Sequence, residues 1–161
     1  MFFITGLPRS RTAWMAAFCS TGSVVCHHEL MGQVSSKQEF WDEMARDNRG
    51  NSDHAHFLLG ELGRVSSPPR VVIIHRPIDD VHQSLVAIGI DNRPFLEENL
   101  AGIESMVGLH VQYSELDSRL EQICDYVGVP FTKARARLYK KLNIQTTHRS
   151  GDPSTLAMWR Q

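Results

Sequence analysis

The sequence predicts an α/β fold, a three-layer sandwich in which helices cover both faces of a central parallel sheet. Residues 2–4 are apolar and are followed by a short polar loop and by apolar residues at helical spacing, so residues 2–21 should form a strand, a loop and the start of a helix. Four consecutive β-branched residues lie in Arg70–His75. Such a run without alternation is typical of a strand buried on both faces in the middle of a parallel sheet.

The composition is that of a soluble globular protein, and we expect one domain over residues 1–161. Hydrophobic residues make up 42% and charged residues 22% of the chain, no apolar run approaches the roughly 20 residues of a membrane-spanning helix, and the N-terminus does not have the pattern of a secretory signal. The cysteines Cys19, Cys26 and Cys124 have no C-x-x-C spacing, which favours reduced thiols in a cytoplasm. With a net charge of −1, we expect neither nucleic acid nor membrane as a partner.

The loop after the first strand has the residues of an oxyanion site. It offers a glycine for a sharp turn, a stiffening proline, two hydroxyl groups and two guanidinium groups, from Gly6, Pro8, Ser10, Thr12, Arg9 and Arg11. Backbone N–H groups and the positive end of the following helix converge on an anion in such a loop. The composition therefore favours a phosphate or a sulfate, although an ordinary strand-loop-helix with solvent-facing arginines has the same pattern.

The ordinary nucleotide-kinase loop, G-x-x-x-x-G-K-S/T, does not fit. Counted from Gly6, its second glycine falls on Arg11, its lysine on Thr12 and its hydroxyl residue on Ala13. The lysine and the hydroxyl that holds magnesium are both missing.

The stretch from Pro8 to Trp14 resembles instead the 5′-phosphosulfate loop of the sulfotransferases that use 3′-phosphoadenosine 5′-phosphosulfate (PAPS). Their pattern is roughly Pro, Lys or Arg, Ser, Gly, Thr, Thr or Ser, Trp, and this chain has Pro-Arg-Ser-Arg-Thr-Ala-Trp. Arg11 replaces the glycine and Ala13 replaces a hydroxyl residue. The resemblance implies that Arg9 contacts the bridging oxygen and the leaving phosphate. It also implies that the 5′ end is held by Pro8, Arg9, Ser10, Arg11, Thr12 and Ala13.

The junction after the second clear strand carries a further resemblance. In the sulfotransferases an Arg at a strand end and a Ser eight residues later hold the 3′-phosphate of the cofactor, and Arg76 and Ser84 have that separation. Ser84 lies seven residues beyond Pro77, so it returns to the same helix face two turns later. The alternative is that Arg76 pairs with a nearby aspartate and that Ser84 only packs.

Two His and one Glu follow a short predicted strand at residues 23–26. If that strand is parallel to the first, His27, His28 and Glu29 lie at the sheet edge where α/β proteins bind ligands. The resemblance implies a His or Glu base there, and we favour His28, with Glu29 next and His75 and His110 after them. A metal site is the less favoured interpretation, because adjacent His side chains diverge.

The other elements are predicted from periodicity. Residues 37–65 should form two helices joined by a turn at 47–52, with Ser52 or Asp53 capping the second. An amphipathic helix is expected at 95–107, a strand at 109–113, and a helix that begins at a Ser114 cap and ends at Gly128. The region from Val111 to Phe131 resembles a structural segment of the sulfotransferases.

Residues 129–151 are basic and contain no acidic residue. The cations are Lys133, Arg135, Arg137, Lys140, Lys141 and Arg149. They form either a solvated helix face or a surface that faces an anion. Arg149 also resembles, in outline, the loop that closes over the 3′-phosphate in the sulfotransferases.

The resemblance as a whole implies transfer of a sulfuryl group from PAPS to the hydroxyl or amine of a small-molecule or glycan acceptor, with PAP as product and without a metal. Two alternatives stay open. A magnesium-dependent kinase would need the missing loop lysine and an Asp at the end of the central strand, which ends at His75 and Arg76. A protein that binds PAP without catalysis would need neither.

Overall fold

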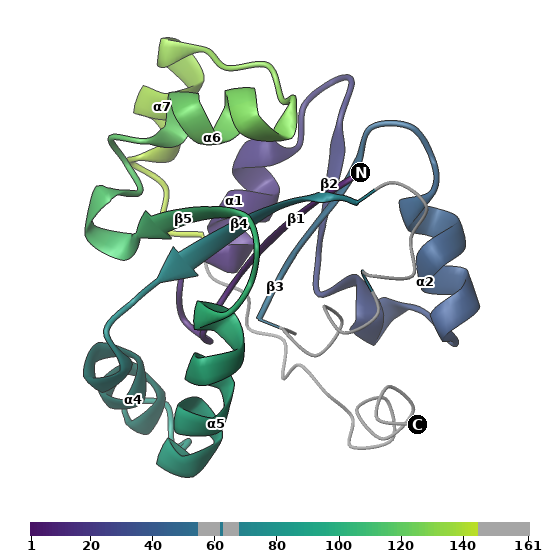
Figure 1. Cartoon of the computed structure of the whole chain (residues 1–161). Helices are drawn as coiled ribbons and strands as arrows, with labels where there is room; N and C mark the ends of the chain where they lie inside the picture. The colour runs from purple at the N-terminus through teal and green to yellow at the C-terminus, as the bar shows by residue number, and fades with distance from the viewer. Residues whose placement is uncertain (55–61, 63–67, 145–161) are drawn as a thin grey trace.

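The computed structural model describes residues 1–54, 62 and 68–144. Five parallel strands form one sheet in the order β2-β3-β1-β4-β5 (Figure 1). Their bounds are β1 (Phe2–Gly6), β2 (Val25–His28), β3 (Arg49–Asp53), β4 (Arg70–His75) and β5 (Leu109–Gln112). The predicted α/β fold with a parallel sheet is confirmed, and the carboxyl ends of all five strands meet at one edge.

Helices cover both faces of this sheet (Figure 1). The helices are α1 (Thr12–Cys19), α2 (Lys37–Met44), α4 (Ile78–Val86), α5 (Arg93–Glu104), α6 (Leu120–Val127) and α7 (Lys133–Tyr139), with 3-10 turns η1 (Leu30–Gln33) and η3 (Tyr113–Glu115). Among the described residues, no helix has the length and apolar character needed to cross a bilayer.

Alternate residues of the two central strands point into two separate cores. Phe2 and Ile4 pack with α1, α6 and α7, whereas Phe3 packs with α2, α4 and α5. Strand β4 divides in the same way, and Val71, Val72, Ile73 and Ile74 are all buried. The prediction of a central strand buried on both faces is therefore confirmed, and the layers number three.

The predicted pair of helices at 37–65 is wrong in its middle. Helix α2 forms, but the expected turn at 47–52 contains most of β3, which lies between β2 and β1. Strand β3 has few residues with high β propensity. Gly50 makes room for a neighbour, because a Cβ atom on it would lie 2.1 Å from Cζ of Phe2.

Specific polar partners also hold β3 in place. The Asn51 side-chain oxygen accepts a hydrogen bond from the backbone N–H of Leu30 at 3.2 Å, and the Ser52 hydroxyl donates to the carbonyl of Thr12 at 2.8 Å. These partners are the first residues of η1 and α1, the elements that follow β2 and β1. The strand is thus specified by tertiary contacts that its own sequence pattern does not show.

Two element ends also differ from the prediction. Helix α5 stops at Glu104, whereas the predicted helix extends to residue 107, and Val107 is 93% exposed. The expected helix after Ser114 begins as η3, and α6 starts only at Leu120. Five apolar residues of this segment are buried: Leu116, Leu120, Ile123, Cys124 and Val127.

The end of β1 lies too close to β4 for a side chain. A Cβ atom on Gly6 would be 2.6 Å from the carbonyl oxygen of Ile74, its register partner, and 3.2 Å from Cβ of Ser10. Gly6→Ala should therefore lower the free energy of unfolding by about 1–3 kcal/mol, as overpacking does. Urea unfolding should show this loss, whereas Gly32→Ala, where nothing lies within 4 Å of the added carbon, should change little. Equal losses in both variants would contradict the steric explanation.

Candidate functional site

The loop between β1 and α1 turns through two left-handed residues. Arg9 has φ 66° and Arg11 has φ 63°, a region that bulky residues seldom adopt and glycine adopts freely. Arg11 is the residue at which the sulfotransferase pattern has glycine, so the backbone shape that glycine would favour is retained. The first N–H groups of α1 begin directly after this turn and have no intrahelical partner.

Ser10 lies inside this loop and is 0% exposed. Its hydroxyl has no hydrogen-bond partner among the described residues. Leaving a buried hydroxyl unpaired costs roughly 1–3 kcal/mol, which native structures seldom tolerate without a reason. A ligand oxygen in the loop is such a reason, because Ser10 could donate to it.

Arg9, Arg76 and Ser84 are brought together by tertiary contacts. Nε of Arg9 donates to the hydroxyl of Ser84 at 3.1 Å, and Nη1 of Arg76 donates to the backbone carbonyl of Arg9 at 2.5 Å. The guanidinium of Arg76 also lies over the ring of Tyr113, at 4.7 Å from its centroid. Its Nε is buried and has no partner among the described residues.

Neither Arg9 nor Arg76 forms an ion pair within the part of the chain that the structure describes. The predicted alternative, in which Arg76 pairs with a nearby aspartate, is not what the structure has. Asp79 instead pairs with Arg93 at 2.5 Å. Two guanidinium groups that lie on one loop and its neighbouring strand end, without a carboxylate partner among the described residues, make a favourable environment for an anion.

Arg11 is engaged elsewhere. Its Nη1 forms an ion pair with Asp117 at 2.8 Å, and its guanidinium lies 4.1 Å from the ring centroid of Trp14. Asp117 therefore pairs with the loop. The backbone of Arg11 therefore shapes the loop, and its side chain holds the loop in place through Asp117 and Trp14.

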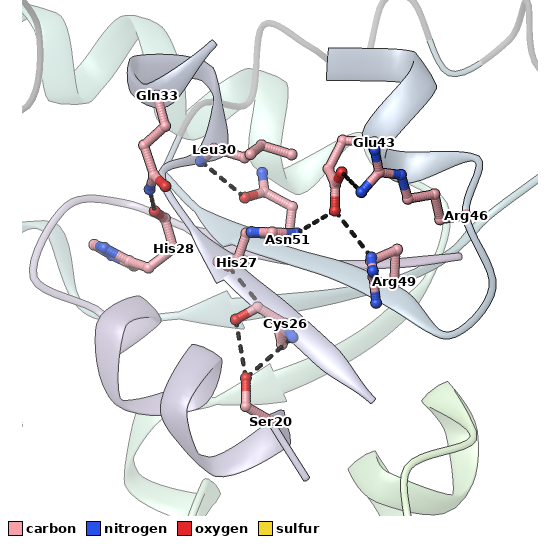
Figure 2. Close-up of polar contacts among 10 residues, drawn as sticks. All are labelled: Ser20, Cys26, His27, His28, Leu30, Gln33, Glu43, Arg46, Arg49 and Asn51. Atoms are coloured by element: carbon pink, nitrogen blue, oxygen red, sulfur yellow. Dashed lines mark hydrogen bonds and ion pairs between the residues drawn. The ribbon is translucent and has the colours of Figure 1, made fainter. Parts of the chain in front are cut away.

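His28 comes next to the start of α1, where its Nε2 lies 3.4 Å from the hydroxyl of Thr12 and 3.8 Å from Oε1 of Glu29. The two residues lie close together because β2 ends at His28 and Glu29 is left-handed, with φ 52°. The alternation of side chains along a strand therefore does not extend to Glu29. Gln33 secures the turn by donating to the carbonyl of His28, and Asn51 by accepting from Leu30 (Figure 2).

His27 belongs to a different group. Its Nε2 lies 3.1 Å from Oε1 of Glu43, and the same carboxylate accepts from Arg49 and pairs with Arg46 (Figure 2). Burial by itself would raise the pKa of Glu43, but the hydrogen bond from Arg49 and the charge of Arg46 hold it below its usual value. This network ties β2 to α2 and leaves His27 out of the phosphate loop.

The end of β3 supplies two residues that sequence reasoning missed. Asp53 is 6% exposed, and its Oδ1 lies 3.4 Å from Nδ1 of His54, which is 3.6 Å from Oε1 of Glu29. Burial lowers the pKa of His54, against the opposing charge of Glu29, and so favours the neutral imidazole. The sequence pattern predicts Asp53 as a helix cap and His54 as part of the helix that follows. Their position at the sheet edge could be predicted only if β3 were recognised as a strand.

His75 and His110, the further base candidates, form a pair of their own. The rings are stacked at 4.9 Å, and Nε2 of His75 lies 2.7 Å from Nδ1 of His110. Because Nε2 of His110 lies 2.9 Å from the carbonyl of Met106, which can only accept, the hydrogen is at that nitrogen. When His110 carries only that hydrogen, its Nδ1 accepts from Nε2 of His75. Arg149, the last predicted contact, lies outside the described residues.

Comparison with known proteins supports the fold class and no finer assignment. No protein-family model and no curated protein matches the chain. The fold is a parallel α/β fold similar to that of a solved sulfotransferase. Among solved structures, mouse sulfotransferase SULT7A1 complexed with PAP is similar, with a TM-score of 0.58 and 12% identity, over 86% of this chain and 61% of that one. The chain thus spans 61% of the length of that structure, and at this identity the likeness shows the fold alone.

The lowered pKa of His75 should make the stability of the protein depend on pH. Burial first, and then the nearby His110, lower the pKa of His75 below its ordinary value, with Glu104 opposing them. As pH falls below about 6.5 the unfolded chain therefore takes up its proton first, and stability is lost. Urea unfolding should show a shallower loss between about pH 7.5 and 5.5 in His75→Gln than in the wild type. The same slope in both proteins would contradict this account.

Proposed function

We propose that the chain is a sulfotransferase-like enzyme that binds PAPS at the carboxyl edge of the sheet and transfers its sulfuryl group to the hydroxyl or amine of a small-molecule or glycan acceptor. The observation that carries the proposal is the convergence of Arg9, Arg76 and Ser84. The sequence pattern assigned these residues to two phosphate sites of one nucleotide, and hydrogen bonds join them. The similarity of the fold to a sulfotransferase crystallised with PAP agrees with it.

The loop would bind the 5′ end of the nucleotide. The buried Ser10 hydroxyl, the N–H groups that begin α1 and the guanidinium of Arg9 are the donors available there. Bound PAPS would supply an activated sulfuryl group whose departure places negative charge on the 5′-phosphate. Arg9 and the backbone donors stabilise that charge without reorganisation, because the fold already fixes them.

Arg76 and Ser84 would bind the 3′-phosphate. The unpartnered Nε of Arg76 is a donor to a phosphate oxygen, and the ring of Tyr113 together with the Arg9 carbonyl fixes the guanidinium plane. Ser84 can donate its own hydroxyl hydrogen while accepting from Arg9.

His28 is the proposed base for the acceptor's proton. Its Nε2 lies near the first residue of α1, beside the loop that would hold the sulfuryl donor. A neutral imidazole accepts a proton well near pH 7. Glu29, 3.8 Å away, is then placed to stabilise the imidazolium that forms.

A magnesium-dependent kinase is the second candidate, because of Asp53. The sequence had offered no Asp at the end of a central strand, but β3 is adjacent to β1 and ends at Asp53. The loop still lacks the lysine that such kinases use. Calorimetric titration with PAP, PAPS, ATP and ADP, with and without magnesium, separates the two functions. Preference for PAP without magnesium supports the sulfotransferase, and magnesium-dependent ATP turnover supports the kinase.

Removal of Arg76 should weaken the binding of nucleotides that carry a 3′-phosphate. A charge-assisted hydrogen bond contributes on the order of 1.5–3 kcal/mol, so Arg76→Ala should raise the Kd for PAP roughly ten- to a hundredfold and that for ADP far less. Arg93→Ala removes the same charge from the exposed Asp79 ion pair and should leave both Kd values unchanged. Equal losses for PAP and ADP in Arg76→Ala would mean that Arg76 only supports the loop.

Removal of Arg9 should affect turnover more than affinity. Arg9→Ala deletes the guanidinium but keeps the backbone carbonyl that accepts from Arg76. If the guanidinium stabilises charge that grows on the leaving phosphate, kcat should fall more than the Kd for PAPS rises. Arg9→Lys, which keeps a positive charge, should recover part of the rate. Normal turnover in Arg9→Ala would refute this role.

His28→Ala should lose on the order of a hundredfold or more in turnover at saturating PAPS, with the Kd for PAP unchanged, because general-base catalysis is removed and the phosphate loop is kept. The measurement uses sulfuryl transfer to an acceptor found by screening hydroxyl and amine compounds. Glu29→Gln should lose less, since it only removes support for the imidazolium. If both variants keep full activity, the base lies elsewhere, and His75 and His110 are the residues to test next.

A further inference from the structure

A second group of polar side chains meets beside the phosphate loop, at the ends of β2 and β3. His28 pairs with Ser52 in the parallel register, so the next residues, Glu29 and Asp53, leave the sheet side by side. His54 follows Asp53. One ligand atom from each of Glu29, Asp53 and His54 lies within 4.8 Å of the other two.

The two distances from the His54 ring fit a shared cation better than direct hydrogen bonds. Nδ1 of His54 is 3.4 Å from Oδ1 of Asp53 and 3.6 Å from Oε1 of Glu29. Both distances exceed the usual range for N–H···O hydrogen bonds. Ligand atoms about 2.0–2.2 Å from a tetrahedral Zn²⁺ ion are separated from one another by roughly 3.3–3.6 Å.

Thr5 gives a second, independent indication. It is 5% exposed, and its hydroxyl is buried without a hydrogen-bond partner among the described residues. In the sheet register Thr5 lies between Asp53 on β3 and Ile73 on β4, so the three side chains share one face. Ile73 offers no polar group, and the polar neighbour on that face is Asp53. A cation, or a water bound to it, would satisfy the Thr5 hydroxyl.

We propose that Glu29, Asp53 and His54 bind a divalent transition-metal ion of the Zn²⁺ or Mn²⁺ type. A set of two carboxylates and one imidazole suits these ions, whereas Mg²⁺ and Ca²⁺ prefer oxygen ligands alone. Three protein ligands leave a coordination position for a water or a ligand oxygen. The site adjoins the loop, since Ser52, next to Asp53, donates to the carbonyl of Thr12. This inference goes beyond the proposed sulfuryl transfer, which needs no metal.

The test is a metal titration of the full chain after removal of metals with a chelator. Co²⁺ reports a tetrahedral site by its visible absorption, and Zn²⁺ should displace it at one equivalent per chain. Loss of a residue that only orients a metal ligand commonly costs 10–100-fold in metal affinity. Loss of a ligand itself, in Asp53→Asn, His54→Gln or Glu29→Gln, should therefore weaken metal binding about 100-fold or more. Three separate variants keep the test valid if one of them does not fold.

Two controls separate this site from other His and carboxylate groups. Glu43→Gln changes the carboxylate beside His27, and His110→Gln changes the stacked pair with His75. Both should bind Co²⁺ as the wild type does. Equal binding by all variants, or only weak binding without the tetrahedral spectrum, overturns the proposal. PAP titration of the metal-free wild type is measured separately, so failure of the metal site and failure of the nucleotide site are distinguishable.

Discussion

The hydrogen bond from Arg76 to the carbonyl of Arg9 is the contact on which the geometry of the site depends. It joins the loop after β1 to the end of β4, two segments 67 residues apart in sequence. Since the acceptor is backbone, the bond fixes the left-handed conformation of Arg9 rather than one side-chain rotamer. The guanidinium of Arg9 is then free of that bond and reaches Ser84 on α4. One contact thus determines where two positive groups and a hydroxyl lie relative to the start of α1.

The parts of this arrangement that the sequence predicts are those encoded locally. Four β-branched residues in a row identify β4 and therefore the position of Arg76 at its end, and the loop pattern identifies Arg9 and Ser10. Both inferences need only neighbouring residues, because burial on two faces and a polar turn leave direct marks on the sequence. Arg9 and Arg76 are far apart in sequence, but a parallel sheet brings them together, because the carboxyl ends of its strands meet at one edge.

Strand β3 was not predictable in the same way. The positions of Asp53 and His54 beside Glu29 depend on this strand. Its side chains are polar and small, and its position is determined by what they meet: Phe2 over Gly50, and the backbone of Leu30 and Thr12 bonded to Asn51 and Ser52. None of these partners is close in sequence. An interpretation based on periodicity therefore assigned the segment to a turn, and Asp53 and His54 could not be recognised as neighbours of Glu29.

The site has a positive half, around Arg9 and Arg76, and a half that contains carboxylates, around Glu29 and Asp53. Thr12 lies between the two halves. Its backbone follows the loop of Arg9 and Ser10, while its hydroxyl approaches His28 and its carbonyl accepts from Ser52. On the first side Arg9 and Arg76 have no ion-pair partner among the described residues, which suits an anionic ligand. On the other side carboxylates and imidazoles gather around Glu29, which suits the loss of a proton or the binding of a cation. Because Thr12 is the first residue of α1, one helix end fixes both groups of side chains in a single frame.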